Sequence, residues 1–183
     1  MPPRNRHKIL TGPVRHDCMN HAIERHATAD KPYHYVGSGL SNVFLIGITY
    51  RVCPVCRFQS ADIPAIKQLH RLIARQVMVQ AEPLLGEQMR FLRKELGEKA
   101  SEFAKIIDVA PETYSRWENG RQRPSLTIDL LVRLYYALNC GDPELVETVR
   151  QVVSRAAVLR RRRKPPNIAA SLEGNRWRAP HAA

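Results

Sequence analysis

The apolar residues of the chain follow two periodicities, one before and one after Pro64. Between residues 17 and 57 they fall in short, interrupted runs of β-branched and aromatic side chains around a Gly37-Ser38-Gly39 turn. Such runs favour a small antiparallel sheet. Beyond Pro64 the apolar residues recur at helical spacing until Pro83, at Ile66, Leu69, Ile73 and Val77. We therefore expect a helix that links an N-terminal β unit to the rest of the chain.

Residues 84–139 predict four further helices with short connections. We place them near 84–96, 99–107, 111–118 and 125–138. Asp142-Pro143-Glu144 opens a fifth helix, because Asp is a good N-cap and Pro suits the first helical position. Its apolar stripe continues through Leu145, Val149, Val152 and Ala156. This stripe either contacts a second copy, together with the helix near 125–138, or belongs to the core of its own chain.

The basic charge of the chain narrows its range of partners. The chain carries 29 Lys and Arg against 17 Asp and Glu, a formal net charge of +12. A surplus of this size indicates a polyanionic partner, foremost nucleic acid. The chain has no signal-peptide pattern and no run of about 18–20 apolar residues, so we expect a cytoplasmic, nucleoid-associated protein without membrane contact. The apolar content of 44% excludes global disorder.

Two short motifs predict one structural zinc site. Cys53-Pro54-Val55-Cys56 is a C-x2-C knuckle at the end of a predicted strand, and Cys18-Met19-Asn20-His21 is a C-x2-H pair upstream of the sheet. Cys18, His21, Cys53 and Cys56 together make a tetrahedral Cys3His set for Zn²⁺. His16, His26 and His34 are alternative fourth ligands, and buried thiols without metal are the alternative to the whole site. We interpret Cys140 as a small hydrophobic residue.

Residues 100–120 have the order helix, tight turn, helix, which is that of a helix-turn-helix. We expect an inward face of Phe103, Ala104, Ile107, Val109, Tyr114 and Trp117. The outward residues of the second helix are then Glu112, Thr113, Ser115 and Arg116. Arg116 can pair with guanine, whereas Glu112 can accept from cytosine or simply complement the helix dipole. Arg121, Gln122 and Arg123 follow over the phosphates, unless these arginines form only a solvated face.

These features together predict an α+β fold, in which a small zinc-bound antiparallel β domain precedes an all-α helix-turn-helix domain. The boundaries are a flexible basic arm at 1–15, a zinc-binding β domain at 16–62, a linker helix at 63–83, a DNA-binding and dimerisation domain at 84–159, and a basic, disordered tail at 160–183.

The run from Ala100 to Ser125 resembles the XRE/Cro-type helix-turn-helix, whose Ser-Arg-aromatic-Glu-x-Gly stretch stands here at 115–120. The whole order is similar to the MqsA-family antitoxins, which combine a YgiT-type zinc domain, a helical linker and an XRE-type domain. The matching positions are Cys18 and His21, and the matching segments are residues 47–56, 100–102, 114–120 and 142–145. The resemblance implies a dimer that binds its operator.

The chain departs from these families at three positions. His21 replaces a family cysteine, Glu112 stands where the antitoxin family can carry a base-reading Asn, and Ala100 stands where XRE domains often carry a phosphate-contacting Gln. Arg116 matches the family arginine. We therefore expect a different operator.

The leading hypothesis is a homodimeric transcriptional repressor on palindromic double-stranded DNA, in one version an autoregulating type II antitoxin with a cognate toxin. A stand-alone phage or prophage regulator would have the same sequence features. The alternative is an interaction antitoxin whose zinc domain captures a toxin. We do not expect an enzyme, because the chain has no nucleophile with a base and no Gly-rich phosphate loop.

Overall fold

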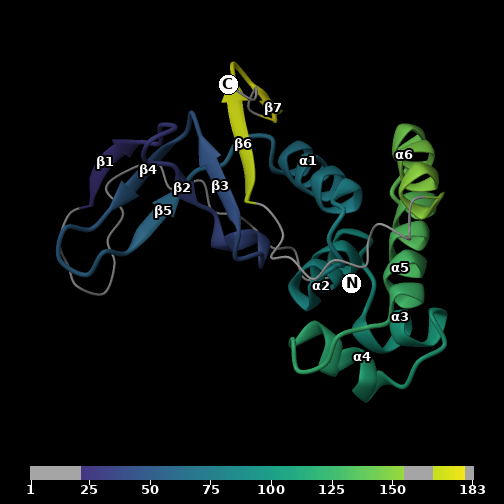
Figure 1. Cartoon of the computed structure of the whole chain (residues 1–183). Coiled ribbons are helices and arrows are strands. Elements are labelled where there is room, and N and C mark those ends of the chain that lie inside the picture. Colours follow the sequence, from purple (N-terminus) through teal and green to yellow (C-terminus); the bar gives the residue numbers. More distant parts are fainter. Residues whose placement is uncertain (1–21, 155–166, 180–183) are drawn as a thin grey trace.

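The structure is a computed structural model that describes residues 22–154 and 167–179. It has the predicted α+β composition (Figure 1). Its helices are α1 (Ile66–Val79), α2 (Gly86–Glu95), α3 (Ala100–Ile106), α4 (Pro111–Glu118), α5 (Leu126–Asn139) and α6 (Pro143–Ser154). Its strands are β1 (Ile23–His26), β2 (Tyr33–His34), β3 (Val43–Ile46), β4 (Thr49–Val52), β5 (Gln59–Ala61), β6 (Ile168–Glu173) and β7 (Arg176–Arg178). The predicted arm 1–15 lies outside the described residues.

The strands form two sheets rather than the single antiparallel sheet of our prediction. One sheet has the order β1-β4-β5 and is antiparallel. The other has the order β2-β3-β6-β7, and its β3 and β6 pair in parallel, with Val43 opposite Ile168. Val43 and Leu45 of β3 are fully buried and Phe44 is half-buried, which is the alternation expected of a strand with one face on the core.

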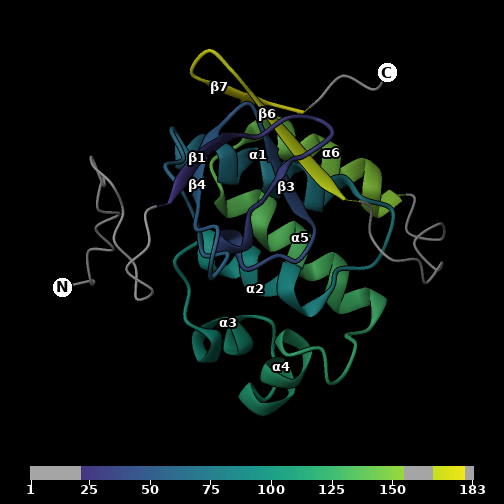
Figure 2. The ribbon, with the colours of Figure 1, turned by 90° about the vertical axis from the view of Figure 1, so that its left-hand side faces the viewer.

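The C-terminal segment corrects our prediction of a disordered tail over residues 160–183. Residues 168–178 form a hairpin, β6 and β7, that completes the second sheet (Figures 1 and 2). Its apolar side chains alternate and are buried, with Ile168, Ala170 and Trp177 each at most 4% exposed. The Trp177 indole N–H also donates to the Pro64 carbonyl oxygen at 2.8 Å. We predicted disorder because the tail is basic. Burial of these apolar side chains instead stabilises a folded hairpin.

Helix α1 packs into the fold instead of bridging two separate units. Leu69, Ile73 and Val77 on its apolar stripe are fully buried, and they belong to one core that continues from the sheets to the helices. In Figure 1 α1 lies between the sheets and the other helices. None of the described helices is long and apolar enough to cross a membrane.

A buried arginine fastens the end of α1 to α5. The Arg133 guanidinium is fully buried and donates to Asp129 Oδ2 at 2.9 Å. It also donates to backbone carbonyl oxygens just before and after the end of α1, those of Met78 (2.6 Å), Gln80 (3.1 Å) and Glu82 (2.8 Å). Because the last carbonyls of a helix have no partner within it, Arg133 replaces the missing donors and holds the α1–α2 connection on α5.

At two positions of α6 the structure decides between the two roles expected for its apolar stripe, a contact with a second copy or part of the core of its own chain. Leu145 is 3% exposed and Val149 is fully buried, so both belong to the core of their own chain. The expectation that these two residues contact a second copy is therefore wrong. The Val152 side chain and Ala156 are not among the described positions.

Candidate nucleic-acid interface and metal centre

Helices α3 and α4 pack on each other across a short turn. The Val109 N–H donates to the Ala104 carbonyl oxygen at 2.9 Å, and Asp108 adopts a left-handed conformation with φ of 55°. Pro111 occupies the first turn of α4, where its missing N–H costs nothing. This turn joins α3 to α4 through only four residues, 107–110.

Aromatic side chains hold α4 in place. Phe103 and Tyr114 are buried with ring centroids 5.4 Å apart, and the Trp117 ring lies edge-on to Tyr114. Ala104 and Ile107 are buried too, and Val109 is half-buried, as the helical spacing predicts. Burial raises the pKa of the Tyr114 hydroxyl, and the nearby Glu118 carboxylate raises it further. These contacts place the opposite face of α4 on the surface.

The C-terminal end of α4 is anchored on α2 by charged residues that our sequence analysis did not single out. Glu118 accepts two hydrogen bonds from the Arg93 guanidinium, at 2.8 and 3.1 Å, and both side chains are buried. Arg90 donates to the Asn119 side-chain oxygen at 2.8 Å. A Cβ on Gly86 would come within 1.9 Å of the Trp117 carbonyl oxygen, so α2 and α4 approach too closely for a side chain there. The sequence gives one signal for the contact between α4 and α2: Glu118 belongs to the Ser-Arg-Trp-Glu-Asn-Gly run at 115–120.

The predicted base-reading residues lie on the free face of α4. Glu112, Ser115 and Arg116 are exposed, and Thr113 is half-buried. The Ser115 hydroxyl accepts a hydrogen bond from the Asn119 amide at 3.3 Å. In both ribbon views α4 lies at the opposite end of the molecule from the β6–β7 hairpin (Figures 1 and 2). This face is thus accessible to a large partner.

The chain leaves α4 through a tight cap that presents three further polar side chains. Gly120 takes the left-handed conformation, with φ of 69°, that commonly ends an α-helix. Arg121, Gln122 and Arg123 are all exposed. In the described part of the chain Arg116, Arg121 and Arg123 have no acidic partner, whereas most arginines of α1, α2 and α5 are engaged in the fold. They form, with Glu112, Thr113, Ser115 and Gln122, what we call the α4 face.

Two of the four predicted zinc ligands lie in the turn between β4 and β5. Cys53 is buried and Cys56 is exposed. The Cys53 N–H donates to the Phe58 carbonyl oxygen at 2.8 Å, and the Arg57 N–H donates back to the Cys53 carbonyl oxygen at 3.0 Å. Arg57 has a positive φ of 59°, so the chain turns tightly around the two thiols. A tight turn of this kind allows one metal ion to contact both sulfur atoms.

Cys18 and His21, the other two predicted ligands, and the alternative His16 lie outside the described residues. Within the residues that are described, no group of three or more His, Cys, Asp or Glu side chains could hold a metal ion. The register places Ile23 opposite Val52, so the chain enters β1 at the end of the sheet where Cys53 lies. Residues 18 and 21 precede Ile23 by five and two positions, and each residue spans at most about 3.6 Å. The chain length therefore allows residues 18 and 21 to reach Cys53, and three Cys and one His are a donor set that suits tetrahedral zinc.

The two described alternative ligands are less suitable. His26 pairs with Thr49 at the other end of β1, about 10 Å along the strand from Ile23. His34 is stacked on Phe44, and its Nε2 lies 3.0 Å from the Ser41 carbonyl oxygen. Cys140 is half-buried at the end of α5, consistent with a small apolar residue.

A comparison with protein-family models identifies the class of protein. The model described as the antitoxin component of a bacterial toxin–antitoxin system, MqsA, matches residues 15–152, about three quarters of the chain. The chain therefore belongs to the MqsA antitoxin family, which implies a cognate toxin as partner. No curated protein and no solved structure gives a significant match. The matched segment ends within α6, so the β6–β7 hairpin lies beyond it.

Proposed function

We propose that this antitoxin is also a sequence-specific transcriptional repressor, which binds a palindromic operator as a homodimer and so controls its own synthesis. The observation that carries the proposal is the α4 face, where Arg116, Arg121 and Arg123 are exposed without acidic partners in the described part of the chain. Neutralising phosphates with such side chains supplies nearly all of the non-specific affinity of a protein for DNA and a large share of its specific affinity.

In this proposal α3 and α4 act as an XRE-type helix-turn-helix. The rigid anchoring of α4 through Glu118 and Arg93 supports this, because base contacts require a helix held in one orientation. Arg116 would pair with a guanine in the major groove, and Glu112 and Thr113 would contact neighbouring bases. Arg121 and Arg123 would contact phosphates and fix the register without reading sequence.

A second copy of the chain is the expected partner of α5. Leu131, Leu134 and Leu138 lie three and four residues apart on this helix and are 38%, 43% and 62% exposed. Residues at this spacing form one stripe on a helix surface. An exposed apolar stripe beside a DNA-binding face is suited to a two-fold contact, which would present two copies of α4 to an operator with two half-sites.

The zinc ion would have a structural role. Cys53 and Cys56, with Cys18 and His21, would close the first sheet at its open end, and no position would remain for a water or a substrate. A closed site of this kind supplies folding free energy to a unit with a small core. We assign no catalytic reaction to the chain. The same domain remains a candidate docking surface for the toxin.

Binding of the chain to the DNA upstream of its own gene tests the proposal. Arg116→Ala should weaken binding to the operator by about 1–3 kcal/mol, roughly 5- to 150-fold, and relax the preference at one base pair per half-site. Arg150→Ala is the matched control, since it removes an exposed arginine of α6 and should leave the affinity unchanged. Fluorescence anisotropy on operator and scrambled duplexes measures both. Equal losses on the two duplexes would refute the assignment of α4 as the reading helix.

A short toxin-like reading frame next to the gene distinguishes an antitoxin from a stand-alone regulator. Co-purification of its product with the chain would establish the pair. Failure of the chain to bind any upstream DNA, with the toxin still captured, would instead favour a protein that acts only by interaction.

A further inference from the structure

The C-terminal hairpin, β6 and β7, lies between the β unit (residues 22–61) and α1 (Figure 1). On the side of the β unit, β6 continues the sheet as the parallel partner of β3, and the Ile168 N–H donates to the Asn42 carbonyl oxygen at 2.8 Å. A Cβ on Gly47 would come within 2.7 Å of the Leu172 carbonyl oxygen, so the turn between β3 and β4 also packs directly on β6. The hairpin is thus joined to the β unit mainly through its backbone.

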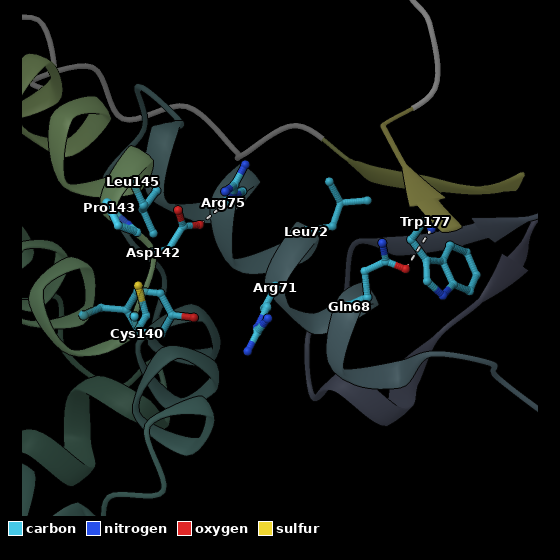
Figure 3. Close-up of a pocket in the computed structure, with 11 residues that line it drawn as sticks. Gln68, Arg71, Leu72, Arg75, Cys140, Asp142, Pro143, Leu145 and Trp177 are labelled. Carbon is cyan, nitrogen blue, oxygen red and sulfur yellow. Dashed lines mark hydrogen bonds and ion pairs between the residues drawn. The ribbon is translucent and has the colours of Figure 1, made fainter. Parts of the chain in front are cut away.

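On its other side the hairpin is attached to α1. The Trp177 backbone N–H donates to the Gln68 side-chain oxygen at 3.3 Å (Figure 3), and the Trp177 indole N–H donates to the Pro64 carbonyl oxygen just before the helix. The Gln76 amide donates to the Ala169 carbonyl oxygen of β6 at 3.2 Å. Gln68 and Gln76 are two turns of helix apart, about 12 Å at 1.5 Å per residue. The hairpin is therefore held at separate points along α1 and not at a single contact.

The strands of the β unit make little contact of their own with the helices. Among the described strands, only β6 and β7 pack broadly on a helix, and that helix is α1. Two side-chain hydrogen bonds join the β unit to the helices directly, one between the Tyr35 hydroxyl and His70 Nε2 at 3.0 Å and one from the Ser41 hydroxyl to Glu87 at 2.7 Å. Single hydrogen bonds contribute only about 0.5–1.5 kcal/mol each to stability. Much of the connection between the two halves therefore passes through the hairpin.

Apolar side chains of the hairpin complete the core where the two halves meet. Ile168, Ala170 and Trp177 belong to the core that also contains Leu45 of β3 and Ile73 of α1. A buried aromatic side chain of this size removes about 150–250 Å² from solvent. Trp177 is the largest apolar side chain of the hairpin, and we expect it to supply most of the energy that holds the hairpin in place.

We propose that the C-terminal hairpin is a strap that holds the β unit and the helical half (residues 66–154) in one fixed orientation, and that release of the hairpin lets the two halves move independently. The strap thereby sets the position of the cysteine turn relative to the α4 face. The family-matched segment, residues 15–152, contains the β unit and the helices but not the hairpin, so the strap lies outside the part of the chain that is shared with the family. The proposal does not depend on operator binding.

Backbone ¹⁵N relaxation of the full-length protein tests this inference, because it gives the rotational correlation time of each half separately. In the wild type we expect one correlation time for the amides of the β unit and of the helical half. In Trp177→Ala the β unit should acquire a shorter correlation time, while the helix content in circular dichroism stays the same. Hydrogen exchange of the β6 amides should become faster by on the order of 100- to 1,000-fold, the usual effect of truncating a buried Trp. Arg176→Ala is the matched control, since it truncates an exposed neighbour on the same strand and should change neither measurement.

A milder variant tests the attachment to α1 without changing the apolar core. Gln68→Ala/Gln76→Ala removes two hydrogen bonds to the hairpin and should accelerate exchange of the hairpin amides about 5- to 150-fold in a folded protein. Unchanged exchange in this variant would refute α1 as the anchor. Two correlation times in the wild type, or a single one in Trp177→Ala, would overturn the strap, because the hairpin would then not decide whether the halves move together. Melting of the helices in Trp177→Ala would also overturn it, since Trp177 would then belong to the core of the helical half itself.

Discussion

Replacing Arg133 by methionine tests how the connection between α1 and α5 is stabilised. Methionine has a similar length and no charge, so the variant removes the hydrogen bonds with little change in packing volume. It leaves Asp129, which is 1% exposed, with a buried carboxylate whose charge partner is gone. The carbonyl oxygens of Met78, Gln80 and Glu82 lose their donor in the same step.

The expected loss is large on the scale of folding stability. Removing one partner of a buried ion pair costs about 3–5 kcal/mol, whereas whole domains are stable by about 5–15 kcal/mol. With a urea dependence of about 2 kcal/mol per molar, the unfolding midpoint should fall by about 2 M. Asp129 also accepts from the Leu84 N–H, so the double variant Asp129→Leu/Arg133→Met removes the stranded charge and should lose less than the two single variants combined.

Urea unfolding followed by far-UV circular dichroism measures these differences. Arg150→Met is the control, because it breaks an exposed ion pair with Glu147 and should cost less than about 0.5 kcal/mol. A loss below about 1 kcal/mol in Arg133→Met would refute the reasoning, since it would mean that the carbonyls and Asp129 find other partners without Arg133.

Three further predictions concern the metal, the dimer and the response to acid. Metal analysis should find one zinc ion per chain, which is lost in Cys53→Ser and retained in Cys140→Ser. Chelation of the zinc should unfold the first sheet without melting the helices. A full zinc content in Cys53→Ser would refute the predicted site. Leu134→Glu should convert the dimer to a monomer in sedimentation without lowering helix content, whereas an unchanged dimer would place the contact elsewhere. Arg75 lowers the pKa of Asp142, so this pair stabilises the fold above about pH 4 and the stabilisation disappears as pH falls through the lowered pKa. The difference in urea midpoint between wild type and Arg75→Ala should therefore be larger at about pH 6 than at about pH 3, and equal differences at both would contradict the assignment.

Local sequence patterns predicted most of the helical half because several independent signals agree there. Apolar residues at helical spacing set the helices from 84 to 139, and the actual ends differ from the expected ones by a few residues. Cap residues set the boundaries: Ser125 accepts from the Ile128 N–H at the start of α5, and Gly120 follows the end of α4. Exposure of Arg116 follows from the same spacing. Patterns of this kind depend on neighbours within one or two turns, which a sequence contains directly.

The second sheet could not be predicted in the same way because its pairing is long-range. Strands β3 and β6 are parallel partners separated by more than 120 residues, and no local pattern specifies such a pair. A local signal for the hairpin does exist, since Gly174-Asn175 is a favourable two-residue turn between alternating strands. We nevertheless predicted disorder for this segment because of the surrounding arginines. The sequence analysis also missed the buried hydrogen bonds of Arg133. A charged residue on an amphipathic helix is normally expected to be exposed to solvent.

Net charge alone does not distinguish arginines that hold the fold together from those available to a partner. Arg133 and Arg93 are buried against carboxylates and carbonyl oxygens, and Arg75 binds Asp142; these side chains have little charge to offer DNA. Arg116 on the exposed face of α4 has no such partner among the described residues. A formal charge of +12 therefore overstates the charge available for binding. Arg116→Ala should therefore cost the chain more of its DNA affinity than Arg75→Ala, although both variants remove one positive charge.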